Sequence, residues 1–241
     1  MGRFGRRRGR RACRGGCGRA LDAEPSVNRP CACPVCRAAG PRPFQSVKGR
    51  DYWRCDGCAA TFLDPRQRPG RAEEEAHYRL HENHPDDPGY RRFLSKLSEP
   101  LMARLPPGAR GLDYGCGPGP ALAAMLGEAG HDVALYDPVF FPDPAPLGTT
   151  HDFVTCTETA EHFYAPAEMF DRLFALVRPG GWLGVMTCFQ TDDARFAAWH
   201  YRADPTHVVF YREATLRELA RARGWACEIP CKDVALMRRT A

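Results

Sequence analysis

The sequence predicts an α/β fold with a mostly parallel sheet, preceded by a small cysteine-rich module. Three observations lead to this prediction. A glycine-rich turn, G-L-D-Y-G-C-G-P-G over residues 111–119, joins a short apolar run to a helix-forming stretch. A second β-rich run, residues 131–137, follows that helix, and two C-x2-C pairs stand nearer the N-terminus, at positions 33–36 and 55–58. Strands that alternate with helices are typical of a parallel sheet with helices on its faces.

Residues 1–30 form a tail that is rich in arginine. The tail holds nine arginines and two acidic residues, a charge of +7, whereas the whole chain carries a net charge of +5. Because it has few apolar residues, we expect the tail to be disordered. We interpret it as a solvated extension, and an arm attracted to RNA or to a membrane is the alternative.

Residues 31–66 are predicted to form a zinc ribbon. Its four cysteines fall in two pairs, Cys33 with Cys36 and Cys55 with Cys58, and positions 37–54 separate the pairs. This spacing is typical of a tetrahedral zinc site in which each pair forms one knuckle. The segment between the pairs indicates a hairpin with its turn at Lys48-Gly49-Arg50. Four thiolates leave no coordination position for water, so the zinc would be structural.

Residues 71–105 connect the ribbon to the second domain, residues 106–241. Two runs in this connection have a helical pattern, and a proline-rich turn at residues 85–89 separates them. We therefore expect two helices before the sheet of the second domain begins.

The glycine-rich turn predicts a strand that leads into a nucleotide-binding helix. Its glycines, Gly115, Gly117 and Gly119, permit unusual backbone angles and let a ligand approach the main chain closely. An acid that follows such a turn by roughly 20 residues, at the end of the second strand of a β-α-β unit, holds a ribose hydroxyl. Asp137 stands at this place. The two features together predict a site for a cofactor that contains a nucleoside.

The segment after Asp137 is short for this kind of fold. Only positions 138–151, four of them prolines, separate Asp137 from the strand that begins near Asp152. Proline cannot donate to a strand ladder. We therefore expect the helix and the third strand that normally fill this interval to be cut short.

The string L-D-Y-G-C-G-P-G resembles motif I of the class I S-adenosylmethionine-dependent methyltransferases. R-P-G-G-W-L, within residues 174–187, is similar to the turn before the fifth strand of that family. The resemblance spans residues 108–237 and implies a Rossmann-like, seven-strand-type sheet with a shortened third-strand region. It also implies a lid over the cofactor from residues 71–105, with Tyr78 and Tyr90 as candidate lid residues. The cofactor contacts that it implies are Asp113, Tyr114, Gly115, Cys116, Gly117, Gly119, Asp137 and Glu158.

Ionisable residues cluster after the next expected strand, residues 151–157. Glu158, Glu161 and His162 would share one face if the segment winds into a helix, at the sheet edge where α/β folds bind ligands. Two carboxylates and an imidazole form a partial shell for Mg²⁺ or Mn²⁺, which waters or substrate oxygens would complete. The string E-T-A-E-H is similar to the E-x-x-E-H of ubiquinone-pathway O-methyltransferases, in which these residues are associated with a divalent cation. The alternative is that the acids suit the start of a helix electrostatically.

Aromatic and histidine residues gather after the fifth expected strand. The segment D-P-T-H-V-V-F-Y, residues 204–211, resembles the loop that shapes the substrate pocket of small-molecule methyltransferases. Trp199, His200, Tyr201 and His207 are therefore pocket candidates, with packing of the aromatic rings as the alternative. His162 and His207 are the candidate catalytic bases, because a neutral imidazole accepts a proton near pH 7.

Composition excludes several classes of protein. A chain of 241 residues with 44% hydrophobic content can form a globular core. No apolar run reaches the roughly 18 residues that cross a bilayer, and no apolar stretch follows the basic N-terminus as it does in a secretory signal. We expect a soluble, cytoplasmic protein with no membrane contact and no obligate protein partner.

The leading interpretation is a methyltransferase that uses S-adenosylmethionine, carries structural zinc and methylates an O, N or C nucleophile of a small molecule. The first alternative is an rRNA or tRNA methyltransferase that docks RNA through the ribbon. The second is a zinc-ribbon binding module without catalysis, which the retained Asp113, glycines and Asp137 disfavour.

Overall fold

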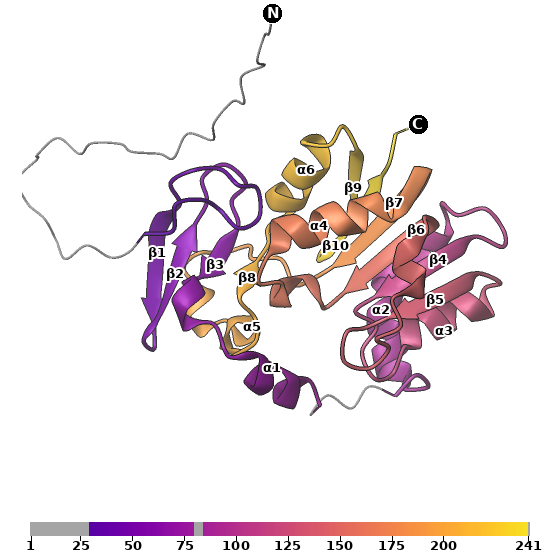
Figure 1. The fold of residues 1–241 in the computed structure, drawn as a ribbon, viewed down its shortest axis with the longest axis horizontal. Helices are drawn as coiled ribbons and strands as arrows, with labels where there is room; N and C mark the ends of the chain where they lie inside the picture. Colours follow the sequence, from indigo (N-terminus) through magenta and orange to yellow (C-terminus); the bar gives the residue numbers. More distant parts are fainter. Residues whose placement is uncertain (1–28, 80–83, 241) are drawn as a thin grey trace, which may run out of the picture.

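The computed structural model describes residues 29–79 and 84–240 (Figure 1). The expectation of a disordered tail over residues 1–30 therefore falls almost entirely outside the described residues. Two sheets and six α-helices make up the described part. The strands are β1 (Arg42–Val47), β2 (Arg50–Arg54), β3 (Thr61–Leu63), β4 (Arg110–Tyr114), β5 (Asp132–Tyr136), β6 (His151–Thr157), β7 (Val177–Met186), β8 (Val209–Phe210), β9 (Ala226–Cys231) and β10 (Val234–Arg238). The helices are α1 (Arg71–Tyr78), α2 (Pro88–Met102), α3 (Ala121–Glu128), α4 (Pro166–Ala175), α5 (His200–Ala203) and α6 (Glu213–Arg221).

The larger sheet has the strand order β5-β4-β6-β7-β10-β9. Strands β4 to β7 pair in parallel, whereas β10 runs antiparallel to both β7 and β9. The prediction of an α/β fold with a mostly parallel sheet is thereby confirmed. Between β5 and β6 the structure has a short 3₁₀ helix, Ala145–Gly148, and a single bridge from Asp137 to Phe141. The proline-rich interval thus adds no third strand beyond β5.

Helices cover both faces of this sheet, and the two cores that result are distinct. On one face α2 contributes Leu94, Leu97 and Leu101, which pack with α3 against Phe153 and Leu236 of the sheet. On the other face α4 and α6 pack against neighbouring positions of the same strands, Val154 and Met237 among them. Adjacent residues of a strand point to opposite faces. Strands β6 and β10 are therefore apolar on both faces, as expected of strands buried on both sides.

The smaller sheet has the order β1-β2-β3-β8, with all pairs antiparallel. Its first hairpin turns at Lys48 and Gly49, whose φ angles are +52° and +77°. Two successive residues with positive φ fit the tight turns that match the twist of a hairpin. The fourth strand, β8, comes from the segment after β7, so the two sheets are joined through it (Figure 1).

The connection between the sheets forms the two helices α1 and α2. The side chain of Asp87 caps α2 by accepting a hydrogen bond from the Tyr90 amide, and Pro88 occupies the first helical position. Within the described residues, none of the helices is both long and apolar enough to cross a bilayer.

Candidate functional site

The glycine-rich turn closes the end of β4 and bends toward β6. Gly115 and Gly117 have φ angles of +75° and +65°, a region in which a side chain is strained. A Cβ on Gly115 would collide with Cγ2 of Thr159. The Gly115 amide donates to the carbonyl oxygen of Tyr136 at 2.7 Å, which ties the turn to the end of β5. Glycine at 115 is thus required both by the backbone and by the approach of Thr159.

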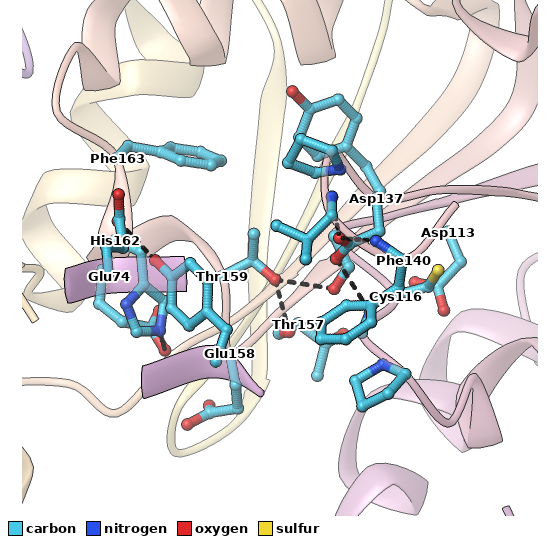
Figure 2. Close-up of a pocket in the computed structure, with 18 of the residues that line it drawn as sticks. Glu74, Asp113, Cys116, Asp137, Phe140, Thr157, Glu158, Thr159, His162 and Phe163 are labelled. Carbon is cyan, nitrogen blue, oxygen red and sulfur yellow. Dashed lines mark hydrogen bonds and ion pairs between the residues drawn. The ribbon is translucent and has the colours of Figure 1, made fainter. Parts of the chain in front are cut away.

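A cavity of about 600 Å³ opens in front of this turn. Figure 2 shows Asp137, Phe140 and Cys116 on one side of it and Glu74 and His162 on the other, with Thr159 between them. The walls come from the ends of β4, β5 and β6, from α1 and α2, and from the segment after β7. The site therefore lies at the carboxyl edge of the parallel strands, where open α/β sheets bind ligands.

Asp113 lies near the end of β4 and is almost completely buried. Its Oδ1 accepts a hydrogen bond from the Thr155 hydroxyl at 2.7 Å. Burial raises the pKa of Asp113 to about 6, with a further contribution from the nearby charge of Asp137. A carboxylate that is held in this way at the cavity wall favours a cationic ligand group, since the cation would stabilise its charged form.

Asp137 lies at the end of β5, and backbone donors surround its carboxylate. Oδ1 accepts hydrogen bonds from the amides of Val139 and Phe140, at 2.8 and 3.0 Å. Oδ2 accepts one from the Gly117 amide at 3.1 Å. A carboxylate has about four lone-pair positions. One position on Oδ2 thus remains for a ligand, and this oxygen also fixes the glycine turn.

Glu158 follows β6 with a φ angle of +47°, which is unusual for a residue with a side chain. Its Oε2 accepts a hydrogen bond from the Tyr201 hydroxyl at 3.2 Å. Burial, together with the charge of Glu161, raises the pKa of Glu158 to about 9. The expected helical face does not form, because the segment is helical only over the 3₁₀ turn Ala160–His162.

The structure brings Glu161 and His162 together with His207 rather than with Glu158. One ligand atom from each of the three residues lies within 4.8 Å of the other two. The rings of His162 and His207 are 4.7 Å apart between centroids and meet edge to face. Burial lowers the pKa of His207. The sequence indicated both histidines separately, but only the fold shows that they are neighbours.

The other candidate residues are divided between the cavity and its surroundings. Tyr114 and Cys116 line the cavity, and burial raises the pKa of the Cys116 thiol. Gly119 does not line it, and its carbonyl accepts a hydrogen bond from Ala121. Trp199, His200 and Tyr201 lie outside the lining, and the Tyr201 hydroxyl donates a hydrogen bond to Oε2 of Glu158.

Helix α1 supplies three lining residues besides the candidate lid residue Tyr78, and the sequence did not indicate these three individually. Arg71, Glu74 and Glu75 face the cavity together with Tyr78, whose hydroxyl donates to Oε1 of Glu74 at 2.6 Å. The Tyr78 ring meets His162 edge to face at 5.1 Å. Tyr90 of α2 also lines the cavity. An acidic run such as A-E-E-E-A suits any exposed helix, so the sequence carries no signal that selects Glu74.

The charge of the lining is strongly one-sided. Among the described residues, seven carboxyl groups line the cavity, against a single guanidinium, that of Arg71. The acidic residues are Glu74, Glu75, Asp113, Asp137, Glu158, Glu161 and Asp204. Such a lining attracts cations and repels phosphates.

The four predicted zinc ligands converge in the smaller sheet, away from the cavity. Their sulfur atoms all lie within 4.8 Å of one another, and the Cys33 to Cys58 and Cys36 to Cys55 distances are 3.8 and 3.6 Å. A tetrahedral Zn–S₄ centre has sulfur atoms about 3.8 Å apart. Each pair also forms the same backbone turn, with positive φ at Arg37 and at Ala59. The four cysteines therefore fit a zinc ribbon.

Comparison with known proteins identifies the family to which more than half of the chain is matched. The family model described as a methyltransferase domain matches residues 81–228. No curated protein matches the sequence. The fold is similar to that of 1,6-didemethyltoxoflavin-N1-methyltransferase from Burkholderia thailandensis, whose structure holds 1,6-didemethyltoxoflavin and S-adenosylhomocysteine. That match has 20% identity and a TM-score of 0.52, and it covers 83% of this chain and 100% of the other.

A second solved structure is an O-methyltransferase family protein, also from Burkholderia thailandensis. It matches with 19% identity and a TM-score of 0.47, over 70% of this chain and 59% of the other. At these identities the likeness concerns the fold alone.

Proposed function

The chain belongs to the methyltransferase domain family and is a class I S-adenosylmethionine-dependent methyltransferase, and we propose that its methyl acceptor is a small molecule. The observation that carries this proposal is one cavity of about 600 Å³ with two differently built ends. The glycine turn and Asp137 suit a nucleoside, whereas Glu74, His162 and His207 stand at the opposite end. A volume of this order is typical of sites for small ligands.

S-adenosylmethionine fits the first end by its chemistry. The remaining acceptor position on Asp137 suits a ribose hydroxyl, and the buried carboxyl of Asp113 suits the cationic part of the cofactor. Phe140 and Val139 add an apolar wall beside Asp137. The bound cofactor would supply a methyl group already activated on a sulfonium. The chain's own residues then have to orient the acceptor and exclude water.

The acidic lining supports a neutral or cationic acceptor over a nucleic acid. An RNA strand would bring phosphates toward a lining with more acidic than basic side chains, which opposes them electrostatically. Helix α1 also closes one side of the cavity through Glu74 and Tyr78. His162 and His207 remain the candidate catalytic residues, because both line the end of the cavity opposite the glycine turn, which we call the acceptor end. The nucleophile, whether O, N or C, stays open.

The proposal also includes structural Zn²⁺ on Cys33, Cys36, Cys55 and Cys58. The sulfur separations and the two equivalent knuckles support it. Pro34, which follows the first cysteine, accepts a hydrogen bond at its carbonyl from the Ala167 amide at the start of α4. Zinc would therefore stabilise the ribbon and, through it, the helix behind the site.

Methyl transfer from labelled S-adenosylmethionine into fractionated cell extract tests the proposal. We expect the label in the small-molecule fraction, at a rate that changes less than about twofold between about 50 and 200 mM salt, because no phosphate contacts are involved. Label in RNA, with a rate that falls steeply with salt, would contradict a small-molecule acceptor.

A further inference from the structure

The residues Glu161, His162 and His207 form a cluster whose donor atoms converge at the acceptor end of the cavity. Glu161 and His162 come from the 3₁₀ turn after β6, and His207 comes from the segment before β8. The Glu161 Oε1 to His162 Nε2 distance is 3.9 Å, and all three donor atoms lie within 4.8 Å of one another. The 3.9 Å separation is too long for a hydrogen bond, and the convergence of three donor atoms suits a shared ion.

Both imidazole rings are oriented by the backbone. Nδ1 of His162 lies 3.1 Å from the carbonyl oxygen of Thr206, and Nδ1 of His207 lies 2.7 Å from that of Tyr201. A carbonyl oxygen only accepts, so Nδ1 is the protonated nitrogen in each neutral ring and Nε2 bears the lone pair. A hydrogen bond of this kind, behind the ligating nitrogen, is the usual support of a metal-bound histidine.

Glu161 provides the third donor and the strongest reason to expect a ligand. Its side chain is completely buried, and Oε2 accepts a hydrogen bond from the Thr187 hydroxyl at 2.9 Å. Oε1 is buried without a hydrogen-bond partner among the described residues. A buried carboxylate oxygen that lacks a partner costs free energy unless a cation or a proton meets it. Oε1 is also the oxygen nearest to His162 Nε2.

We propose that Glu161, His162 and His207 bind a divalent transition-metal ion, with two imidazole nitrogens and one carboxylate oxygen as ligands. Two nitrogen donors favour ions such as Mn²⁺, Fe²⁺, Co²⁺ or Zn²⁺ over Mg²⁺, which prefers oxygen. Glu158 is not part of this set of converging donors, and its Oε2 accepts a hydrogen bond from the Tyr201 hydroxyl. Three protein ligands leave further coordination positions on the side of the cavity.

A role for the ion in methyl transfer rests on the proposed small-molecule function. An ion held there would act as a Lewis acid toward an acceptor group that reaches it. His162 and His207 would then act as ligands rather than as bases. Binding of the ion itself does not depend on methyl transfer, so the two proposals can fail separately.

Titration with Mn²⁺ of protein that carries one Zn²⁺ per chain, the amount that the thiolate site takes up, tests the site when free Mn²⁺ is followed by electron paramagnetic resonance. Mn²⁺ prefers nitrogen and oxygen donors and leaves the thiolate site to zinc. We expect one equivalent to bind to the wild-type protein. His207→Ala and Glu161→Gln should each weaken binding by at least about tenfold, since even the loss of an outer-shell partner costs that much.

Two matched variants complete the experiment. His200→Ala removes an exposed histidine of α5 outside the cavity lining, and Glu158→Gln removes the carboxylate of the set implied by the sequence resemblance. Both should bind Mn²⁺ as the wild-type protein does. A wild-type protein that leaves Mn²⁺ free overturns the proposal, whether or not the variants fold. Binding that is lost in Glu158→Gln but retained in His207→Ala also overturns it. Mn²⁺ binding without any methyl transfer would instead count against the proposed function alone.

Discussion

The carboxylates at the strand ends differ in their hydrogen bonds and burial, although in the sequence they are all acids that follow or end a strand. Asp137 accepts three backbone hydrogen bonds, which organise the glycine turn and the segment after β5. Asp113 is buried beside it with one hydroxyl donor. Glu158 follows β6 with a positive φ angle and accepts a hydrogen bond from the Tyr201 hydroxyl. The environment of each carboxylate sets what its substitution should do.

Asp137→Asn should weaken the binding of S-adenosylmethionine by about 1–3 kcal/mol, because the substitution removes an acceptor for the ribose and places an amide group opposite the Gly117 N–H. Isothermal titration calorimetry would measure the change. Asp143→Asn is a suitable control, because Asp143 also accepts a bond from a nearby backbone amide, that of Ala145, but lies outside the cavity lining. Equal affinity in both variants would show that Asp137 does not contact the cofactor.

Asp113→Asn should stabilise the protein without cofactor at pH 8, by up to about 3 kcal/mol. The pKa of this carboxyl is about 6 in the fold and about 3.9 in an unfolded chain. Its contribution to stability is therefore complete below about pH 4 and is lost as the pH rises through 6. The difference between variant and wild type should grow over that window, as followed by thermal unfolding.

The comparison of the two proteins at each pH cancels the titration of the cysteine cluster, which both share. A constant difference in stability from pH 4 to pH 8 would mean that Asp113 is not destabilised by its burial. The same variant should bind S-adenosylmethionine more weakly, because the charge that suits the cationic ligand is lost.

At the scale of elements, strand β8 couples the cysteine ribbon to the acceptor end of the cavity. The Leu63 amide at the end of β3 donates to the Val208 carbonyl at 2.9 Å. The Val208 amide donates in turn to the Glu161 carbonyl, also at 2.9 Å. His207 is the residue before Val208. A backbone path thus leads from the ribbon sheet to the candidate metal ligands.

Removal of zinc should therefore loosen the acceptor end as well as the ribbon. We expect the amides of Leu63 and Val208 to lose at least about tenfold of their hydrogen-exchange protection in Cys36→Ser, because their partners would no longer be held in place. Cys31→Ser is the matched control, since Cys31 is exposed and stands outside the four-cysteine cluster. Protection of Val208 that is unchanged in Cys36→Ser would show that the two parts are independent.

Across the whole molecule, one hydrophobic core joins the ribbon to the face of the larger sheet that α4 and α6 cover. Ribbon residues such as Tyr52 and Phe62 belong to the same buried cluster as Phe170 of α4 and Leu216 of α6. The opposite face is closed separately by α2 and α3. The cavity lies at the edge of the parallel strands, where α1 and the segment after β7 meet. The acceptor end is thus assembled from parts that are far apart in the sequence.

The sequence alone predicted the parts of this protein that depend on local chemistry. The alternation of strand and helix, the G-L-D-Y-G-C-G-P-G turn and the spacing of Cys33, Cys36, Cys55 and Cys58 follow from backbone preferences and knuckle geometry. These features need only a few consecutive residues. The same holds for the shortened interval after Asp137, because its prolines cannot donate to a strand ladder.

Only the tertiary structure decided which distant side chains meet. The helical spacing of Glu158, Glu161 and His162 predicted a shared face, but positive φ at Glu158 breaks it, and His207 takes the place beside Glu161. Glu74 of α1 lines the cavity, and β8 pairs with the ribbon sheet, although no sequence signal predicted either placement. Such contacts depend on how the chain folds back on itself. Local periodicity carries no information on them, whereas the packing of α1, β6 and the segment after β7 fixes them.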